Sequence, residues 1–274
     1  MKKFLITIIS AFLLVSSAYA ADKVSADYLL NKKHFAPMNP VAEFAAETAI
    51  KKSLKKETGA NFKVKFIGYT LSSMKAGVFK YLEISGKDIK IEGIALPYIK
   101  LKSVTTYNRV DYTKDPVEML SDMTFDYELH LSEQSINAAL KHEDYKKTIR
   151  NVNKRAYPLF MINDVRIKIK DNNVYVVMDY NFPINPVSKN RTFAVKSNIH
   201  VVNGIIKANN ICIDKIYGSL PSDKVANLIN LLDPLSFTLD IMNSNKCNGK
   251  IENIKLEDNL FHVNGKIYVK GDNK

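Results

Sequence analysis

The chain has 274 residues and a formal net charge of +12, from 40 Lys and Arg against 28 Asp and Glu. This length is enough for one large hydrophobic core or two small ones. No segment after the first 20 residues is apolar enough to span a bilayer, which excludes a helical membrane protein, and the chain contains no repeat or low-complexity segment.

The N-terminal sequence MKKFLITIISAFLLVSSAYA has the three parts of a secretory signal peptide. A basic start (residues 2–3) precedes an apolar run (residues 4–15) and a small-x-small cleavage site (residues 18–20). We therefore expect residues 1–20 to be removed by cleavage after Ala20, which leaves a soluble protein exported to the periplasm or extracytoplasmic envelope. Loss of two lysines leaves 38 basic against 28 acidic residues, a net charge of +10.

This basic excess limits the partners that we expect. An exported protein rarely meets nucleic acid, so no nucleic-acid partner is expected. The charge fits a solvated basic surface, or attraction to anionic lipid head groups or envelope polymers, with about 1 kcal/mol for each basic residue near an anionic membrane. Net charge alone leaves these interpretations open.

A long helix is predicted after a leader of no clear period (residues 21–39). Asn39 suits the N-cap and Pro40 the first helical position, and the pattern runs to about Thr58, with Gly59 just past the end. The apolar arc of this helix includes Phe44, Ile50 and Leu54, and alanines leave it thin on one side.

Four lysines crowd the last turns of this helix: Lys51, Lys52, Lys55 and Lys56. Cations suit the C-terminal end of the helix dipole, so a solvated helix end is the simpler interpretation. Contact with lipid head groups is the functional one.

From residue 61 onwards, strand patterns dominate. Alternating apolar and polar residues predict strands over 62–66, within 77–112, over 125–131, 165–182, 192–202, through Cys212, 235–242 and 250–270. Short helices are predicted from Ser132, after a break near Glu143-Asp144 where Asp144 can cap, and from Ser222 to Pro234. Tight turns at Asn203-Gly204 and Asp258-Asn259 join consecutive strands. This order predicts an α+β protein with an antiparallel sheet.

The hairpin over residues 165–182 has one aliphatic and one wet face. Taking Asn172-Asn173 as its two-residue turn places Ile169 opposite Val176 and Ile167 opposite Met178. The same register places Arg166 opposite Asp179 on the wet face. The aliphatic face lies against either an ordinary protein core or something that the protein carries, and the pattern alone leaves both open.

Motifs for catalysis or metal binding are missing. Five His residues, at 34, 130, 142, 200 and 262, show no ligand spacing, and neither a nucleophile elbow nor a phosphate-binding loop is present. We therefore assign no catalytic residue, no metal and no cofactor. A catalytic dyad assembled from distant residues would not be visible in a sequence.

Cys212 and Cys247 form an even pair, and in an oxidising compartment this favours a disulfide over two free thiols. Such a bridge closes a loop of about 35 residues and would contribute roughly 4 kcal/mol in the chain-entropy model.

Two stretches carry a resemblance to a known family: GVFKYLEISGKDIKIEG (residues 77–93) and FDYELHLSEQSINAAL (residues 125–140). With the exported N-terminus, they resemble the LmeA-like phospholipid-binding family of bacterial envelope proteins, which is similar in architecture to tubular lipid-binding proteins. The resemblance implies one lipid-binding domain over residues 40–274. It also implies an elongated, curled antiparallel sheet wrapped around the long N-terminal helix, with an apolar groove for acyl chains.

From this resemblance and the apolar faces described above, we expect eight side chains to contact lipid: Phe44, Ile50, Leu54, Phe66, Ile167, Ile169, Val176 and Met178. The leading hypothesis is a non-enzymatic protein that holds phospholipid acyl chains and shuttles lipid at an anionic membrane surface. The alternatives are a structural or adhesive envelope module that binds an anionic polymer, and a hydrolase with a dispersed site.

Overall fold

The computed structural model describes residues 39–91, 94–111, 114, 118–184, 190–213, 222–235 and 247–272. The predicted signal peptide and nearly all of the leader lie outside these residues, as does nearly all of the strand expected over 235–242. Within the described part, no helix combines the length and apolarity needed to cross a bilayer.

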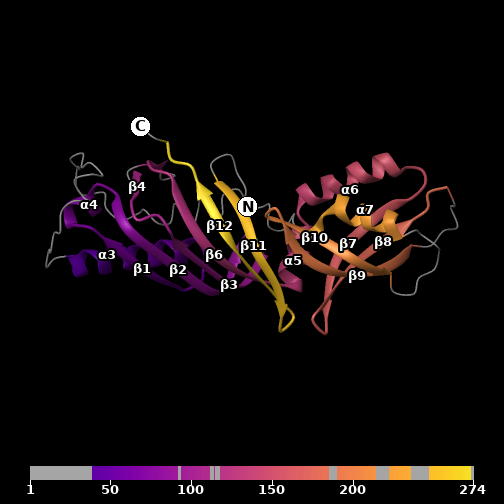
Figure 1. The fold of residues 1–274 in the computed structure, drawn as a ribbon, viewed down its shortest axis with the longest axis horizontal. Helices are drawn as coiled ribbons and strands as arrows, with labels where there is room; N and C mark the ends of the chain where they lie inside the picture. Colours follow the sequence, from indigo (N-terminus) through magenta and orange to yellow (C-terminus); the bar gives the residue numbers. More distant parts are fainter. Residues whose placement is uncertain are drawn as a thin grey trace. The chain divides into compact units, whose positions relative to one another are not determined.

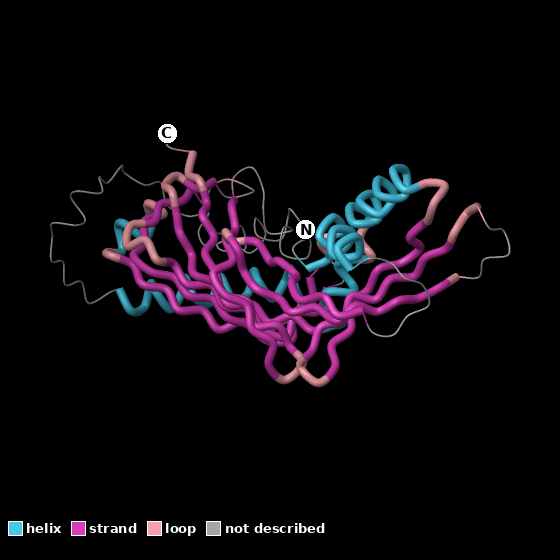
Figure 2. Tube along the Cα trace, turned by 45° about the vertical axis from the view of Figure 1, so that its right-hand side comes forward, coloured by secondary structure: helices cyan, strands magenta, loops and turns pink. Residues whose placement is uncertain are grey.

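The fold is α+β with mostly antiparallel sheets (Figures 1 and 2). The helices are α3 (Asn39–Thr58), α4 (Leu71–Lys75), α5 (Glu133–Leu140), α6 (Glu143–Ala156) and α7 (Ser222–Leu232). The strands are β1 (Phe62–Gly68), β2 (Val78–Ile91), β3 (Ile94–Ser103), β4 (Asn108–Asp111), β5 (Glu118–Met119), β6 (Met123–Ser132), β7 (Met161–Lys170), β8 (Asn173–Asn181), β9 (Arg191–Val202), β10 (Ile205–Ile213), β11 (Cys247–Glu257) and β12 (Leu260–Val269).

The strands form two sheets. The larger has the order β11-β12-β6-β3-β2-β4-β5, with β1 also paired to β2, and the smaller has the order β10-β9-β8-β7. Contacts divide the chain into two compact units. Unit 1 holds residues up to 129 with 242–250 and 264–274, and unit 2 holds 130–241 with 251–263. Strands β6, β11 and β12 contribute residues to both units, and the single domain expected over 40–274 stays a prediction.

In unit 1, α3 packs on β1 and β2. Ile50 and Leu54 are buried on this side of the helix. Two carboxylates of α3 also accept backbone hydrogen bonds from β1: Glu47 from the N–H of Phe66 at 3.1 Å and Glu43 from that of Gly68 at 2.9 Å. Among the described residues, β1 pairs with β2 alone. The helix therefore supplies acceptors that a further strand would otherwise provide.

Unit 2 repeats this arrangement with amide side chains along the edge strand β7. Asn137 on α5 accepts from the Ile167 N–H at 2.7 Å and donates to its carbonyl at 2.8 Å. Asn153 on α6 binds both backbone groups of Ile162 in the same way, at 2.8 and 2.9 Å. Glu133 accepts from the N–H of Ile169 at 2.8 Å. Helix α6 contacts β7, α7 contacts β10, and the two helices contact each other, so they cover one face of the four-stranded sheet (Figure 1).

The faces of the β7–β8 hairpin are as predicted, but the register was wrong. The turn residues are Asp171 and Asn172, both with φ near +53°, so Ile167 lies opposite Val176 and Ile169 opposite Val174. The prediction placed the turn one residue later. That error shifts the pairing by two residues, and because strand side chains alternate with a period of two, it leaves both faces unchanged. Arg166 still binds Asp179, now as a diagonal neighbour.

Other local predictions were mostly confirmed. Turns form at Asn203-Gly204 and Asp258-Asn259, where positive φ suits Asn, Asp and Gly. Ser132 caps α5 by accepting from the N–H of Ser135 at 3.1 Å. The break before α6 is present, but His142 occupies the N-cap position expected for Asp144. The five-residue helix α4, capped by Thr70 and Ser73, was not predicted.

Candidate functional site

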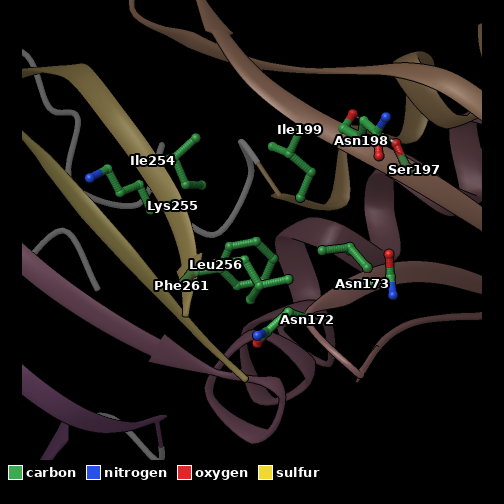
Figure 3. Close-up of a pocket in the computed structure, with 10 residues that line it drawn as sticks. Asn172, Asn173, Ser197, Asn198, Ile199, Ile254, Lys255, Leu256 and Phe261 are labelled. Atoms are coloured by element: carbon green, nitrogen blue, oxygen red, sulfur yellow. Dashed lines mark hydrogen bonds between the residues drawn. The ribbon is translucent and has the colours of Figure 1, made fainter. Parts of the chain in front are cut away.

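A pocket of about 230 Å³ lies within unit 2, beside the β7–β8 turn and the β11–β12 hairpin (Figure 3). It is lined by Asn172, Asn173, Val174, Ser197, Asn198, Ile199, Ile254, Lys255, Leu256 and Phe261. These residues come from two distant parts of the sequence, the β8–β9 pair and the end of the β11–β12 hairpin.

Two hairpin turns hold the walls of this pocket together. The N–H of Asn259 donates to Oδ1 of Asn172 at 3.1 Å, and the N–H of Asn172 donates to Oδ1 of Asn259 at 3.4 Å. Each turn therefore binds the other through one side chain and one backbone group. The N–H of Ile251 also donates to the carbonyl of Gly204, in the β9–β10 turn, at 3.4 Å. Short Asn-containing turns thus position the β11–β12 hairpin against the other strands of unit 2.

The pocket has an apolar floor and half-buried aliphatic walls. Val174 and Phe261 are 2% and 1% exposed, respectively, whereas Ile199, Ile254 and Leu256 are each half-buried. In Figure 3, Ile199 lies across the pocket from Ile254, and Leu256 and Phe261 lie below them. When an apolar ligand covers aliphatic groups that are partly in contact with water, the free energy of the system falls.

Polar groups stand at one side of the pocket. Asn172, Asn173 and Asn198 bring amide donors and acceptors, and Ser197 brings a buried hydroxyl that donates to the carbonyl of Asn198 at 3.3 Å. Lys255 is the one charged residue among the ten that line the pocket, and its side chain points away from the pocket in Figure 3. The lining therefore combines half-buried aliphatic groups with neutral polar groups.

None of the eight side chains expected to contact lipid lines this pocket. In unit 1, Ile50, Leu54 and Phe66 are buried where α3 packs on β1, but Phe44 is 68% exposed. The three buried residues therefore lie together at a helix–sheet contact, and Phe44 does not join them.

The other four expected contacts lie in the β7–β8 hairpin of unit 2. Ile167, Val176 and Met178 are at most 1% exposed, and Ile169 is half-buried. Strand β7 contacts α5 and α6. The aliphatic face of the hairpin thus belongs to the core of unit 2.

The four lysines near the end of α3 belong to unit 1. Lys52, Lys55 and Lys56 are exposed, and the Nζ of Lys51 lies 3.6 Å from the Glu47 carboxylate. Glu47 also accepts a hydrogen bond from the Phe66 N–H at the edge of β1. Lys51 is therefore partly neutralised, while the other three project into solvent.

Cys247 is buried in β11 of unit 1, and burial raises the pKa of its thiol form to about 12. Cys212 lies in β10 of unit 2, where its backbone is opposite Lys196, and its side chain falls outside the described part of the chain. The bridge between the two cysteines stays a prediction.

Two histidines that the sequence separates by 132 positions meet in unit 2. Nδ1 of His262 lies 3.1 Å from Nε2 of His130, and their ring centroids are 4.1 Å apart. Within the described residues, no group of three His, Cys, Asp or Glu side chains could hold a metal ion. The pair is a hydrogen-bonded contact between neighbouring strands β6 and β12, and spacing along the sequence gave no sign of it.

The pocket residues were also missed at the sequence level. Ile254 and Leu256 alternate with polar neighbours, which identifies a strand face but does not identify what that face lies against. Comparison of the chain with family models, curated proteins and solved structures finds no match.

Proposed function

We propose that this chain is an exported, non-enzymatic lipid-binding protein that holds part of a phospholipid acyl chain in the unit 2 pocket. The observation that carries the proposal is the set of half-buried aliphatic side chains, Ile199, Ile254 and Leu256, around the apolar floor. The N-terminal signal sequence and the resemblance to LmeA-like proteins support the same function.

The size of the pocket limits how much lipid it holds. Its volume of about 230 Å³ is below the roughly 300–1,000 Å³ typical of sites for drug-sized ligands. A segment of one chain fits this space better than two whole acyl chains. With about 0.8 kcal/mol for each buried CH₂, a segment of about six methylenes contributes roughly 5 kcal/mol. The amides of Asn172, Asn173 and Asn198 offer partners for ester or head-group oxygens.

The finer architecture belongs to the same proposal. An elongated sheet curled around the N-terminal helix would place an acyl-chain groove beside Ile50, Leu54 and Phe66. Lys52, Lys55 and Lys56, exposed on the same helix, would then meet anionic head groups, and lipid shuttling in the envelope would follow from both contacts.

One surface favours the alternative, a module that binds an anionic envelope polymer. The outer face of β1, β2 and β3 in unit 1 places Lys63, Lys65, Lys87, Lys100 and Lys102 in neighbouring register positions. The Nζ of Lys65 lies 5.8 Å from the Tyr81 ring centroid. Glu83 lies on the same face, and its carboxylate accepts a hydrogen bond from Tyr81. The Nζ of Lys100 lies 3.2 Å from this carboxylate, and both contacts hold the pKa of the Glu83 carboxyl below its usual value. Such a basic face suits a polyanion.

Protein exported from a bacterial host provides the test, by native mass spectrometry and lipid extraction. We expect wild-type protein to carry phospholipid and Leu256→Trp to reduce its occupancy, because the added ring fills the pocket. Asn253→Trp is the matched control, since Asn253 is an exposed neighbour on β11 outside the pocket. An unliganded wild-type protein that also takes up no phospholipid from vesicles contradicts the proposal. The alternative would then be supported if wild-type protein is retained on an anionic polymer and the double variant Lys63→Gln with Lys65→Gln is retained less.

A further inference from the structure

Large apolar side chains are exposed together at one end of unit 2. Tyr157 and Leu159, in the connection between α6 and β7, are 65% and 68% exposed. Met161, at the start of β7, is 36% exposed, and Ile184, just after β8, is 65% exposed. We call these four side chains the apolar tip.

The two segments that carry the apolar tip lie side by side. Met161 pairs in register with Asn181, which leads directly into the segment of Ile184. The Asn163 amide donates to Oδ1 of Asn190 at 3.1 Å, which ties the start of β7 to the residue before β9. Figure 2 shows both loops at the same end of the β7–β9 strands.

Backbone hydrogen bonds fix the first of these segments. The N–H of Tyr157 donates to the carbonyl of Asn153 at 2.9 Å, and the N–H of Leu159 donates to that of Ala156 at 2.8 Å. The Asn153 side chain holds both backbone groups of Ile162 just beyond. The apolar side chains are thus presented on a bonded scaffold and remain exposed.

Positive charge surrounds the apolar tip. Lys154, Arg155 and Arg191 are exposed, and the guanidinium of Arg191 lies 5.2 Å from the Phe182 ring centroid. The described residues around the tip are 153–163, 180–184 and 190–193, and none of them is Asp or Glu. The nearest acidic residues along the strands, Asp164 and Asp179, are both paired with Arg166.

We propose that the apolar tip is the surface through which this chain docks on an anionic phospholipid bilayer. Tyr157, Leu159, Met161 and Ile184 enter the interfacial layer, while Lys154, Arg155 and Arg191 contact the head groups. This inference builds on the proposed lipid binding, because it names the route by which the chain reaches its lipid.

Charge complementarity favours a bilayer over a protein partner as the occupant. Apolar side chains on loops, flanked by Lys and Arg without acidic neighbours, match the layered chemistry of an anionic membrane surface. Tyr also favours the head-group level, where its ring is buried and its hydroxyl stays wet. A second copy of this chain would bring the same basic groups together, and their repulsion opposes self-association through this surface.

A single tryptophan provides a direct test, because the chain contains none. Leu159→Trp places a fluorophore at the apolar tip, and Val202→Trp places one at the opposite end of β9, roughly 36 Å from Arg191 at about 3.3 Å per residue. We expect the emission of Leu159→Trp alone to shift to shorter wavelength with vesicles of phosphatidylethanolamine and phosphatidylglycerol. Equal shifts for the two variants, or no shift for Leu159→Trp, would overturn the inference.

Vesicle co-sedimentation gives the second measurement. Leu159→Ser with Ile184→Ser should lower the partition coefficient about tenfold or more, since several carbon atoms leave the interface. Val104→Ser with Tyr268→Ser removes two exposed apolar side chains from unit 1, 46% and 44% exposed, and should leave partitioning unchanged. The inference is overturned if the control pair has the larger effect, or if wild-type protein binds phosphatidylcholine vesicles equally well.

Lipid extraction from the same samples separates this inference from the proposed function. A tip variant that keeps bound lipid but loses vesicle binding supports docking through the apolar tip. If wild-type protein carries no bound lipid but still docks through the apolar tip, lipid binding in the pocket is contradicted and the docking surface is supported. Wild-type protein that carries lipid but does not bind the anionic vesicles overturns the docking surface alone.

Discussion

Substitution of Asn137 by Ala tests how much the helix side chains stabilise the edge of β7. The Asn137 amide makes two hydrogen bonds of 2.7 and 2.8 Å to the backbone of Ile167, a residue that is 1% exposed. Removing the amide leaves one N–H and one carbonyl without partners, at about 1–3 kcal/mol for each buried group. Alanine recovers about 0.5 kcal/mol through its better helix propensity. We expect the free energy of unfolding to fall by about 1.5–5.5 kcal/mol.

Urea unfolding followed by circular dichroism measures this change. Gln134→Ala is the control, because Gln134 is exposed on the same helix, and this variant should stay within about 0.5 kcal/mol of wild type. If Asn137→Ala also stays within that range, water or a relaxed backbone provides the hydrogen bonds of Ile167, and the Asn137 side chain does not stabilise the edge of β7.

Three further predictions follow from other contacts. Gly265→Ala should destabilise the chain by more than about 2 kcal/mol in a thermal melt, since a Cβ there would lie 2.1 Å from the Lys250 carbonyl oxygen and 2.8 Å from the Tyr127 ring; an unchanged melting temperature would contradict the packing. The hydrogen bond from Arg166 lowers the pKa of Asp179, so this pair stabilises the fold above the ordinary Asp pKa of about 3.9 and loses that effect as pH falls through the lower, folded value. Arg166→Met should therefore weaken the fold at pH 7 more than at pH 2, and urea melts with equal losses at both would count against it. Thiol titration of exported, denatured protein should find no free thiol if Cys212 and Cys247 are bridged, whereas two free thiols would exclude the bridge.

Local chemistry was predictable wherever a residue type and a backbone conformation agree. Asn203-Gly204 and Asp258-Asn259 were identified as turns because few other residues tolerate positive φ. At the β7–β8 turn, Asp171-Asn172 and Asn172-Asn173 suit such a conformation equally well, so composition could not choose between them. The two faces of the hairpin were therefore predicted correctly, whereas the register was not.

Contacts between distant segments were not predictable from one sequence. Asn137 and Ile167 are thirty positions apart, and an Asn on a short helix has no pattern that names its partner. The same limit applies to the pocket, where Ile199 and Ile254 come from strands that alternate in the ordinary way. A period of two reveals that a side chain faces inward, whereas only the fold reveals whether a helix, a strand or open space lies there.

The helix-covered strand edges have a consequence for the order of folding during synthesis. A ribosome releases a protein from its N-terminus, and in both units the covering helix comes before the strand that it covers: α3 before β1, and α5 and α6 before β7. Each strand edge therefore leaves the ribosome after the helix that covers it. A circular permutant that delivers β7 ahead of α5 would expose that edge to neighbouring chains during synthesis, and aggregation would compete with folding.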